Sequence, residues 1–139
     1  MCGIVGLIDL NHKSTETQLK SMVSTLNHRG PDSQDHLLLK RDGYSIGLGH
    51  ARLSIIDLST VANQPMQFEH LQIVYNGEIY NHKEIKAELE LLGHQFKTSS
   101  DTEVILQAYR AWGKEAIHKF IGMFAFAIYD EQEEELFLC

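Results

Sequence analysis

Residues 71–93, LQIVYNGEIYNHKEIKAELELLG, place an apolar strand directly before an amphipathic helix. The run LQIVY at 71–75 is short and mostly apolar, as expected of a strand. A helix is expected to follow it, with Asn81 as its N-cap and Gly93 just past its end. Its apolar side chains recur on one face at Ile85, Leu89 and Leu92. A strand followed so closely by a helix predicts helices packed on a sheet.

The rest of the chain continues this alternation, with further strands expected at 3–9, 36–40, 44–50, 53–57, 122–130 and 135–139. Further helices are expected at 15–27 and 101–112, with a helical turn around Ile117 and Phe120. Thr15 and Gln18 fit a capping box at the first of these helices. Ser100 or Asp101 fits the N-cap of the second. The order predicts an α+β fold of sheets with helices packed on them, without a repeating βαβ array.

Length and composition indicate one acidic domain covering residues 1–139. Lys and Arg number 12, and Asp and Glu number 19, which gives a net charge of −7. Such a chain has no broad electrostatic reason to bind nucleic acid or an anionic membrane. Two cysteines, no secretory signal and no apolar run of membrane-span length predict a cytoplasmic protein. The chain stops within an apolar strand at Cys139, so we expect a truncated domain that lacks its C-terminal strands.

The common cofactor-binding patterns are not found in the sequence. No two of the 8 histidines have the i, i+3 or i, i+4 spacing of zinc ligands on one helix face. There is also no Gly-Lys-Ser/Thr phosphate loop. No metal site and no cofactor are therefore expected in this domain.

Cys2 is the residue with the most distinctive chemistry. Removal of Met1 would make it the N-terminal residue, with a thiol and a free α-amine on the same residue. An α-amine titrates near ~7.7–8.0, so at neutral pH it can accept the thiol proton and return it to a leaving group. Cys2 would then supply both nucleophile and base. Taken alone, it is equally a small apolar residue at the start of a strand, and that interpretation is the commoner one.

Three further positions have both a chemical and a structural interpretation. Asn76 and Gly77 offer a side-chain amide and a backbone N–H to a developing oxyanion, and they are also a strong hairpin signal. Arg52 has the planar fork that binds a carboxylate, or is an ordinary surface arginine. Asp101 is either a helix cap or a partner for an ammonium group. The segment HRGPD at 28–32 is typical of a helix end followed by a turn, and we interpret it as structural.

The N-terminal sequence MCGI and six later segments together resemble one protein family, in that family's order. The later segments are HRGPD at 28–32, GHARLSIIDL at 49–58, NQPM at 63–66, YNGEIYN at 75–81, SSDTEVIL at 99–106 and GMFAFAIYD at 122–130. The start resembles the class II glutamine amidotransferases, which are N-terminal nucleophile hydrolases. The RLSI and NGEIYN wording resembles the glutamine-hydrolysing asparagine synthetase branch rather than the sugar-aminating or purine-pathway branches.

The resemblance implies a four-layer α-β-β-α sandwich of two mainly antiparallel sheets. It also implies that Cys2, freed from Met1, attacks the side-chain amide of glutamine, forms a glutamyl thioester and releases ammonia. Asn76 and Gly77 match the oxyanion hole of the family. The positions that match substrate-binding residues are Arg52, Leu53, Ile55, Asn76, Gly77, Glu78 and Asp101. Among these, Arg52 matches the residue that holds the α-carboxylate, and Glu78 and Asp101 match contacts of the α-amino group.

The resemblance also implies the partners of the domain. They are glutamine, a synthetase domain or chain that uses the ammonia for ATP-dependent asparagine synthesis, and a second copy of this chain. ATP and magnesium are expected only for that synthetase domain, because its Ser-Gly-Gly loop is not in this sequence. Two alternatives stay open. The chain is an inactive fold remnant or interaction module, or it is a redox protein that pairs Cys2 with Cys139.

Overall fold

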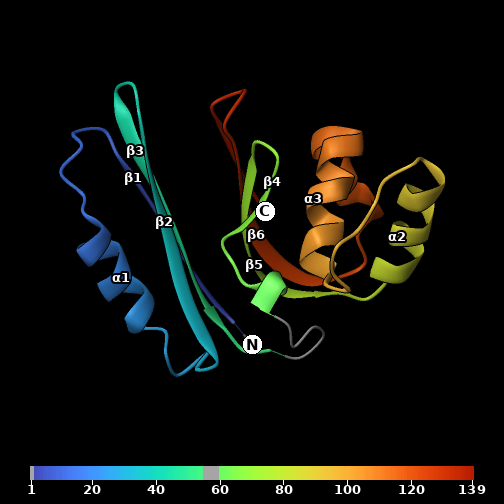
Figure 1. Cartoon of the computed structure of the whole chain (residues 1–139), viewed down its shortest axis with the longest axis horizontal. Helices are drawn as coiled ribbons and strands as arrows, with labels where there is room; N and C mark the ends of the chain where they lie inside the picture. The colour runs from blue at the N-terminus through green and yellow to red at the C-terminus, as the bar shows by residue number, and fades with distance from the viewer. Residues whose placement is uncertain (1, 55–59) are drawn as a thin grey trace.

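The computed structural model describes residues 2–54 and 60–139. Figure 1 shows four layers, in which one helix, a three-stranded sheet, a four-stranded sheet and a pair of helices lie side by side. The strand pairs formed by these residues are all antiparallel. The predicted α+β class and its α-β-β-α layering are confirmed.

The first sheet contains β1 (Gly3–Asp9), β2 (Ser33–Arg41) and β3 (Tyr44–Arg52), in the order β1-β3-β2. The central strand β3 is buried at every residue but its first, because it is covered on both faces. The hairpin expected around Gly43 is confirmed, with φ of 79° at that glycine, and both of its strands are longer than predicted. β1 lies at the sheet edge, so its side chains alternate between burial and solvent, and Ile8 is 58% exposed.

Helix α1 (Glu16–Ser24) covers the outer face of this sheet (Figure 1). The expected capping box is present: the Gln18 N–H donates to Thr15 Oγ1 at 3.2 Å, and the Thr15 N–H donates to Gln18 Oε1 at 2.8 Å. The helix lies close to β3 because Gly49 has no side chain. A Cβ there would stand 2.3 Å from a methyl carbon of Val23.

The second sheet contains four strands in the order β4 (Met66–Phe68), β5 (Leu71–Ile79), β6 (Gly122–Asp130) and β7 (Glu135–Leu138). The hairpin expected between β6 and β7 is confirmed. β5 does not stop at residue 75, since Asn76 and Gly77 pair with Ala125 and Phe124 of β6. The hairpin interpretation of Asn76 and Gly77 is therefore wrong.

The outer face of the second sheet is covered by α2 (His82–Leu91), α3 (Asp101–Trp112) and the 3₁₀ segment η2 (Gly113–Lys119). Ser100 caps α3, because its Oγ accepts from the Thr102 N–H at 3.0 Å. Asn81 precedes α2 without a side-chain cap bond, and it bonds instead to Lys119 and Ile121. The expected apolar face of α2 is wrong at Leu92, which lies just past the end of the helix and is 61% exposed.

The larger hydrophobic core lies between the second sheet and α2 and α3, and a smaller one lies between the sheets. The strand expected at 53–57 is wrong at Leu53 and Ser54, which have no regular structure, and its other residues lie outside the described ranges. η1 (Thr60–Ala62) leads into the second sheet. Across residues 2–54 and 60–139, no helix combines the length and apolar character needed to cross a membrane.

Candidate active site

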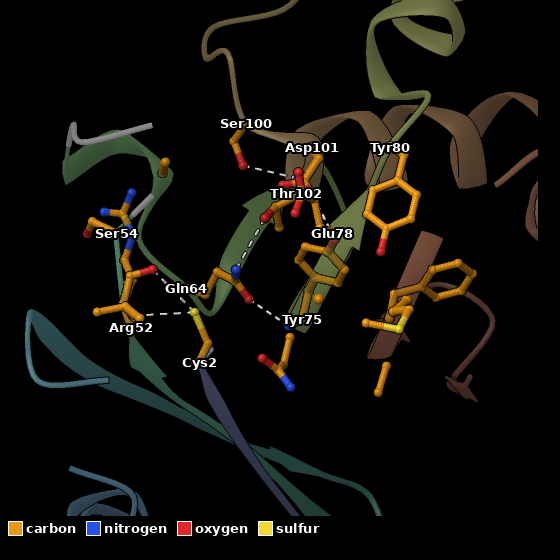
Figure 2. Close-up of a pocket in the computed structure, with 17 residues that line it drawn as sticks. Cys2, Arg52, Ser54, Gln64, Tyr75, Glu78, Tyr80, Ser100, Asp101 and Thr102 are labelled. Carbon is orange, nitrogen blue, oxygen red and sulfur yellow. Dashed lines mark hydrogen bonds between the residues drawn. The ribbon is translucent and has the colours of Figure 1, made fainter. Parts of the chain in front are cut away.

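A cavity of about 460 Å³ opens beside the residues that follow β3, a size typical of small-molecule sites. Figure 2 shows its walls, with Cys2 and Arg52 on one side and Tyr75, Glu78 and the start of α3 on the other. It brings together seven of the eight predicted site residues, namely Cys2, Arg52, Leu53, Asn76, Gly77, Glu78 and Asp101. The eighth, Ile55, lies outside the described residues.

Cys2 reaches this cavity because the β1–β3 register pairs Gly3 with Ala51, next to the end of β3. Its Sγ accepts a hydrogen bond from the Leu53 N–H at 3.3 Å and lies 3.6 Å from the Leu53 carbonyl oxygen (Figure 2). Arg29 Nε donates to the Cys2 carbonyl oxygen at 2.9 Å. An N–H aimed at the sulfur favours the thiolate, so the surroundings of Cys2 support a nucleophile.

The segment 28–32 braces the backbone on both sides of this corner. Arg29 holds the Cys2 carbonyl, while the Asp32 N–H donates to the Arg52 carbonyl oxygen at 3.0 Å. Asp32 Oδ2 accepts from the Ser54 N–H at 2.8 Å. The interpretation of this segment as structural is therefore sound, but what it supports is the backbone around the cysteine and the arginine.

Arg52 is the last residue of β3 and is 7% exposed. Its Nη1 donates to Asn63 Oδ1 at 2.5 Å, which orients the guanidinium group. A nearly buried guanidinium in the wall of a small cavity is suited to bind an anion, and its planar fork matches a carboxylate. The structure thus favours the chemical interpretation of Arg52 over that of an ordinary surface arginine.

Asn76 and Gly77 lie in β5 at the cavity wall. Gly77 has φ of 149°, and a Cβ at this position would stand 2.3 Å from the Met123 carbonyl oxygen of β6, so only glycine fits. Asn76 Oδ1 is buried and is the one buried side-chain oxygen or nitrogen of the described chain that has no hydrogen-bond partner. A buried amide with unmet hydrogen bonding at a cavity wall is suited to a bound ligand.

Asp101 is 4% exposed at the start of α3 and is not the helix cap, which is Ser100. Its Oδ2 accepts from the Tyr75 hydroxyl at 2.6 Å and from the Ile79 N–H at 3.2 Å. Burial and the neighbouring carboxylate raise the pKa of Tyr75, so this hydroxyl stays protonated and donates. With Glu78 at the rim and Arg52 opposite, the cavity presents both signs of charge, as a zwitterionic amino acid does.

Gln64 was not singled out by the sequence, apart from its place in the NQPM segment. It is 6% exposed, its Oε1 accepts from the Tyr75 N–H at 2.6 Å, and its Nε2 donates to Thr102 Oγ1 at 3.2 Å. β4 pairs with β5 only as far as Met66 opposite Ile73. Beyond that point the Gln64 side chain takes over, and it ties β5 to the start of α3 (Figure 2).

His50 was also not singled out. It is 1% exposed on β3, and its Nε2 lies 3.1 Å from the Tyr75 carbonyl oxygen. Burial lowers the pKa of His50 from 6.5 to about 4, and the nearby positive charge of Arg52 acts in the same direction. His50 is therefore neutral at physiological pH.

The neutral state of His50 is expected to make the fold acid-sensitive. Its pKa is about 4 in the folded chain and 6.5 when exposed, so between these values the unfolded state binds more protons. This contribution is complete above pH 6.5 and is lost as the pH falls toward 4, about 3 kcal/mol in all. Denaturant unfolding across this range should show a steeper loss for the native chain than for His50→Gln. Equal slopes would contradict the assignment.

Comparisons with known proteins agree with this geometry. The glutamine amidotransferase domain family matches residues 1–139. The chain is 40% identical to asparagine synthetase (glutamine-hydrolysing) 1 of Bacillus subtilis over 99% of its own length and 22% of that protein. It is also 40% identical to asparagine synthetase (glutamine-hydrolysing) 2 of Arabidopsis thaliana, over 96% of its own length and 23% of that protein. The chain thus spans less than a third of the curated relatives it matches.

A solved structure supports the fold. Glutamine phosphoribosylpyrophosphate amidotransferase from B. subtilis, complexed with ADP and GMP, matches 92% of this chain and 35% of its own chain. The TM-score is 0.71 at 21% sequence identity, so the similarity concerns the fold alone. It confirms the predicted sandwich of the N-terminal nucleophile hydrolase type.

Proposed function

This chain belongs to the glutamine amidotransferase domain family, and from that premise we propose that it hydrolyses the side-chain amide of glutamine with Cys2 as nucleophile. The observation that carries the proposal is the single cavity lined by Cys2, Arg52 and Asp101. A thiol placed between a cation and a carboxylate suits an α-amino acid whose side chain ends in a reactive carbonyl group.

Binding is proposed to use both charges of the substrate. Arg52, oriented by Asn63, holds the α-carboxylate through its paired N–H groups. Glu78 and Asp101 accept from the α-ammonium group, with Asp101 kept in place by Tyr75. Leu53 contributes backbone wall beside the sulfur, and the substrate-binding role of Ile55 stays a prediction.

The proposed chemistry needs the free α-amine that Cys2 gains when Met1 is removed. The amine takes the thiol proton, Sγ bonds to the amide carbon, and the carbonyl oxygen becomes negative. The Asn76 amide and the Gly77 N–H donate to that oxygen. The C–N bond then breaks, the Cys2 ammonium returns its proton to the leaving nitrogen, and ammonia departs. Water attacks the glutamyl thioester, which releases glutamate and restores the thiol.

We further propose that the ammonia serves a larger protein. The names of the relatives indicate ATP-dependent synthesis of asparagine by a synthetase domain, in the cytoplasm, as the destination. ATP and magnesium would act in that domain, and the glutaminase step needs neither. A second copy of the chain remains a candidate partner.

The first test is an intact mass spectrum after brief exposure to a diazoketone analogue of glutamine. We expect a chain without Met1 that carries one adduct on Cys2, formed more slowly when glutamine is present. Cys139 provides the matched control, because burial raises the pKa of its thiol and it lies outside the cavity. Loss of Met1 with no adduct would overturn the proposal and favour the inactive remnant.

A further inference from the structure

His50 joins the two sheets beside the active site. It lies on β3 two residues before Arg52 and pairs with Ile4 of β1. Its Nε2 contacts the Tyr75 carbonyl oxygen of β5 at 3.1 Å. A carbonyl oxygen only accepts hydrogen bonds, so Nε2 carries the proton and donates it. One N–H thus links the sheet that carries Cys2 and Arg52 to the strand that carries Asn76 and Gly77.

The bond acts directly on the position of Asn76. The Tyr75 carbonyl and the Asn76 nitrogen belong to one peptide unit, which is planar and rigid. A donor that holds the carbonyl therefore sets the plane from which Asn76 continues. The Tyr75 N–H is held by Gln64 at 2.6 Å, so side chains supply both partners that a neighbouring strand would provide.

This hydrogen bond lies in a dry part of the molecule. His50 is 1% exposed and Tyr75 is 3% exposed. A buried carbonyl that loses its donor is costly to leave unpaired, so the strand would shift to find another partner. Any such shift would move Asn76 and Gly77 relative to the sulfur of Cys2.

We propose that His50 is a positioning residue, whose Nε2–H bond to the Tyr75 carbonyl holds Asn76 and Gly77 in register with the Cys2 thiol. It touches neither the sulfur nor the substrate carbonyl, and it acts through the peptide unit that precedes Asn76. This inference rests on the proposed glutamine hydrolysis, because it assigns His50 a part in that reaction.

The test compares three variants of the full chain. His50→Leu removes the donor at similar volume, and His50→Gln keeps an Nε2–H at the same number of bonds from Cβ. Tyr44→Phe is the matched control, since it removes a different hydrogen bond between the sheets, from Tyr44 to Tyr129 at 2.8 Å. We expect kcat for glutamine to fall about tenfold to a hundredfold in His50→Leu, with KM changed less than about threefold. His50→Gln should recover most of this loss, and Tyr44→Phe should keep kcat.

Two measurements separate this inference from the proposed function. Alkylation of Cys2 by iodoacetamide should proceed at the native rate in His50→Leu, because thiol reactivity does not need the oxyanion donors. Nitrogen NMR of the native chain should show the His50 proton on Nε2, and amide exchange at Asn76 and Gly77 should speed up in His50→Leu. A native chain that binds no glutamine and releases no glutamate overturns the proposed function. An active native chain with the proton on Nδ1, or an active His50→Leu with native kcat, overturns the role of His50 alone.

Discussion

Replacing Cys2 with alanine is expected to abolish glutamine hydrolysis, with a loss of at least about a thousandfold in kcat. The sulfur forms the bond that becomes the thioester, and alanine offers no atom that could replace it. The contacts of Cys2 that involve the backbone, including the 2.9 Å bond from Arg29 to its carbonyl, do not depend on the side chain. The variant should therefore fold as the native chain does, which thermal unfolding would verify alongside glutamate release.

Cys2→Ser is the control for processing of the N-terminus. Alanine and serine are both small, so Met1 should be removed from both variants, and intact mass would confirm it. An inactive Cys2→Ala that lacks Met1 then reports on the thiol, and retention of Met1 cannot explain the loss. Glutamine hydrolysis that persists in Cys2→Ala at the native rate would show that another group is the nucleophile.

Sequence patterns predicted the parts of the fold whose contacts are close along the chain. The capping box between Thr15 and Gln18 spans three residues, and the structure confirms it. The Asn81 cap was wrong, because its side chain finds partners 38 and 40 residues away. The Asn76–Gly77 pair fits a turn or a strand equally well locally, and pairing with β6 decides between them.

Resemblance located the residues with substrate-facing chemistry, but it did not indicate those that act through the backbone. Arg29 and His50 both donate to main-chain carbonyls, 27 and 25 residues away, and Gln64 accepts from a main-chain N–H. Every residue has a carbonyl, so no pattern of side-chain types reveals such a partner. These contacts become visible only when the two sheets are brought together.

Asn76→Ala is expected to lower kcat by about a hundredfold to a thousandfold, the usual cost of losing one oxyanion donor. KM for glutamine should change little, because the negative oxygen exists only in the transition state and intermediate. Asn76 suits this test better than Gly77, where any Cβ would press on the Met123 carbonyl of β6 and disturb the strand itself. Steady-state kinetics of glutamate release would measure both parameters.

Asn63→Ala offers the contrasting variant. Asn63 orients the Arg52 guanidinium at 2.5 Å, so its loss should weaken substrate binding and raise KM more than it lowers kcat. Asn76→Asp keeps the size of the side chain but places a carboxylate where a donor is needed, so its kcat should fall at least as far as that of Asn76→Ala. The oxyanion assignment therefore requires opposite kinetic patterns at two asparagines of the same site. A variant at Asn76 that raised KM with an unchanged kcat would instead place this amide in ground-state binding.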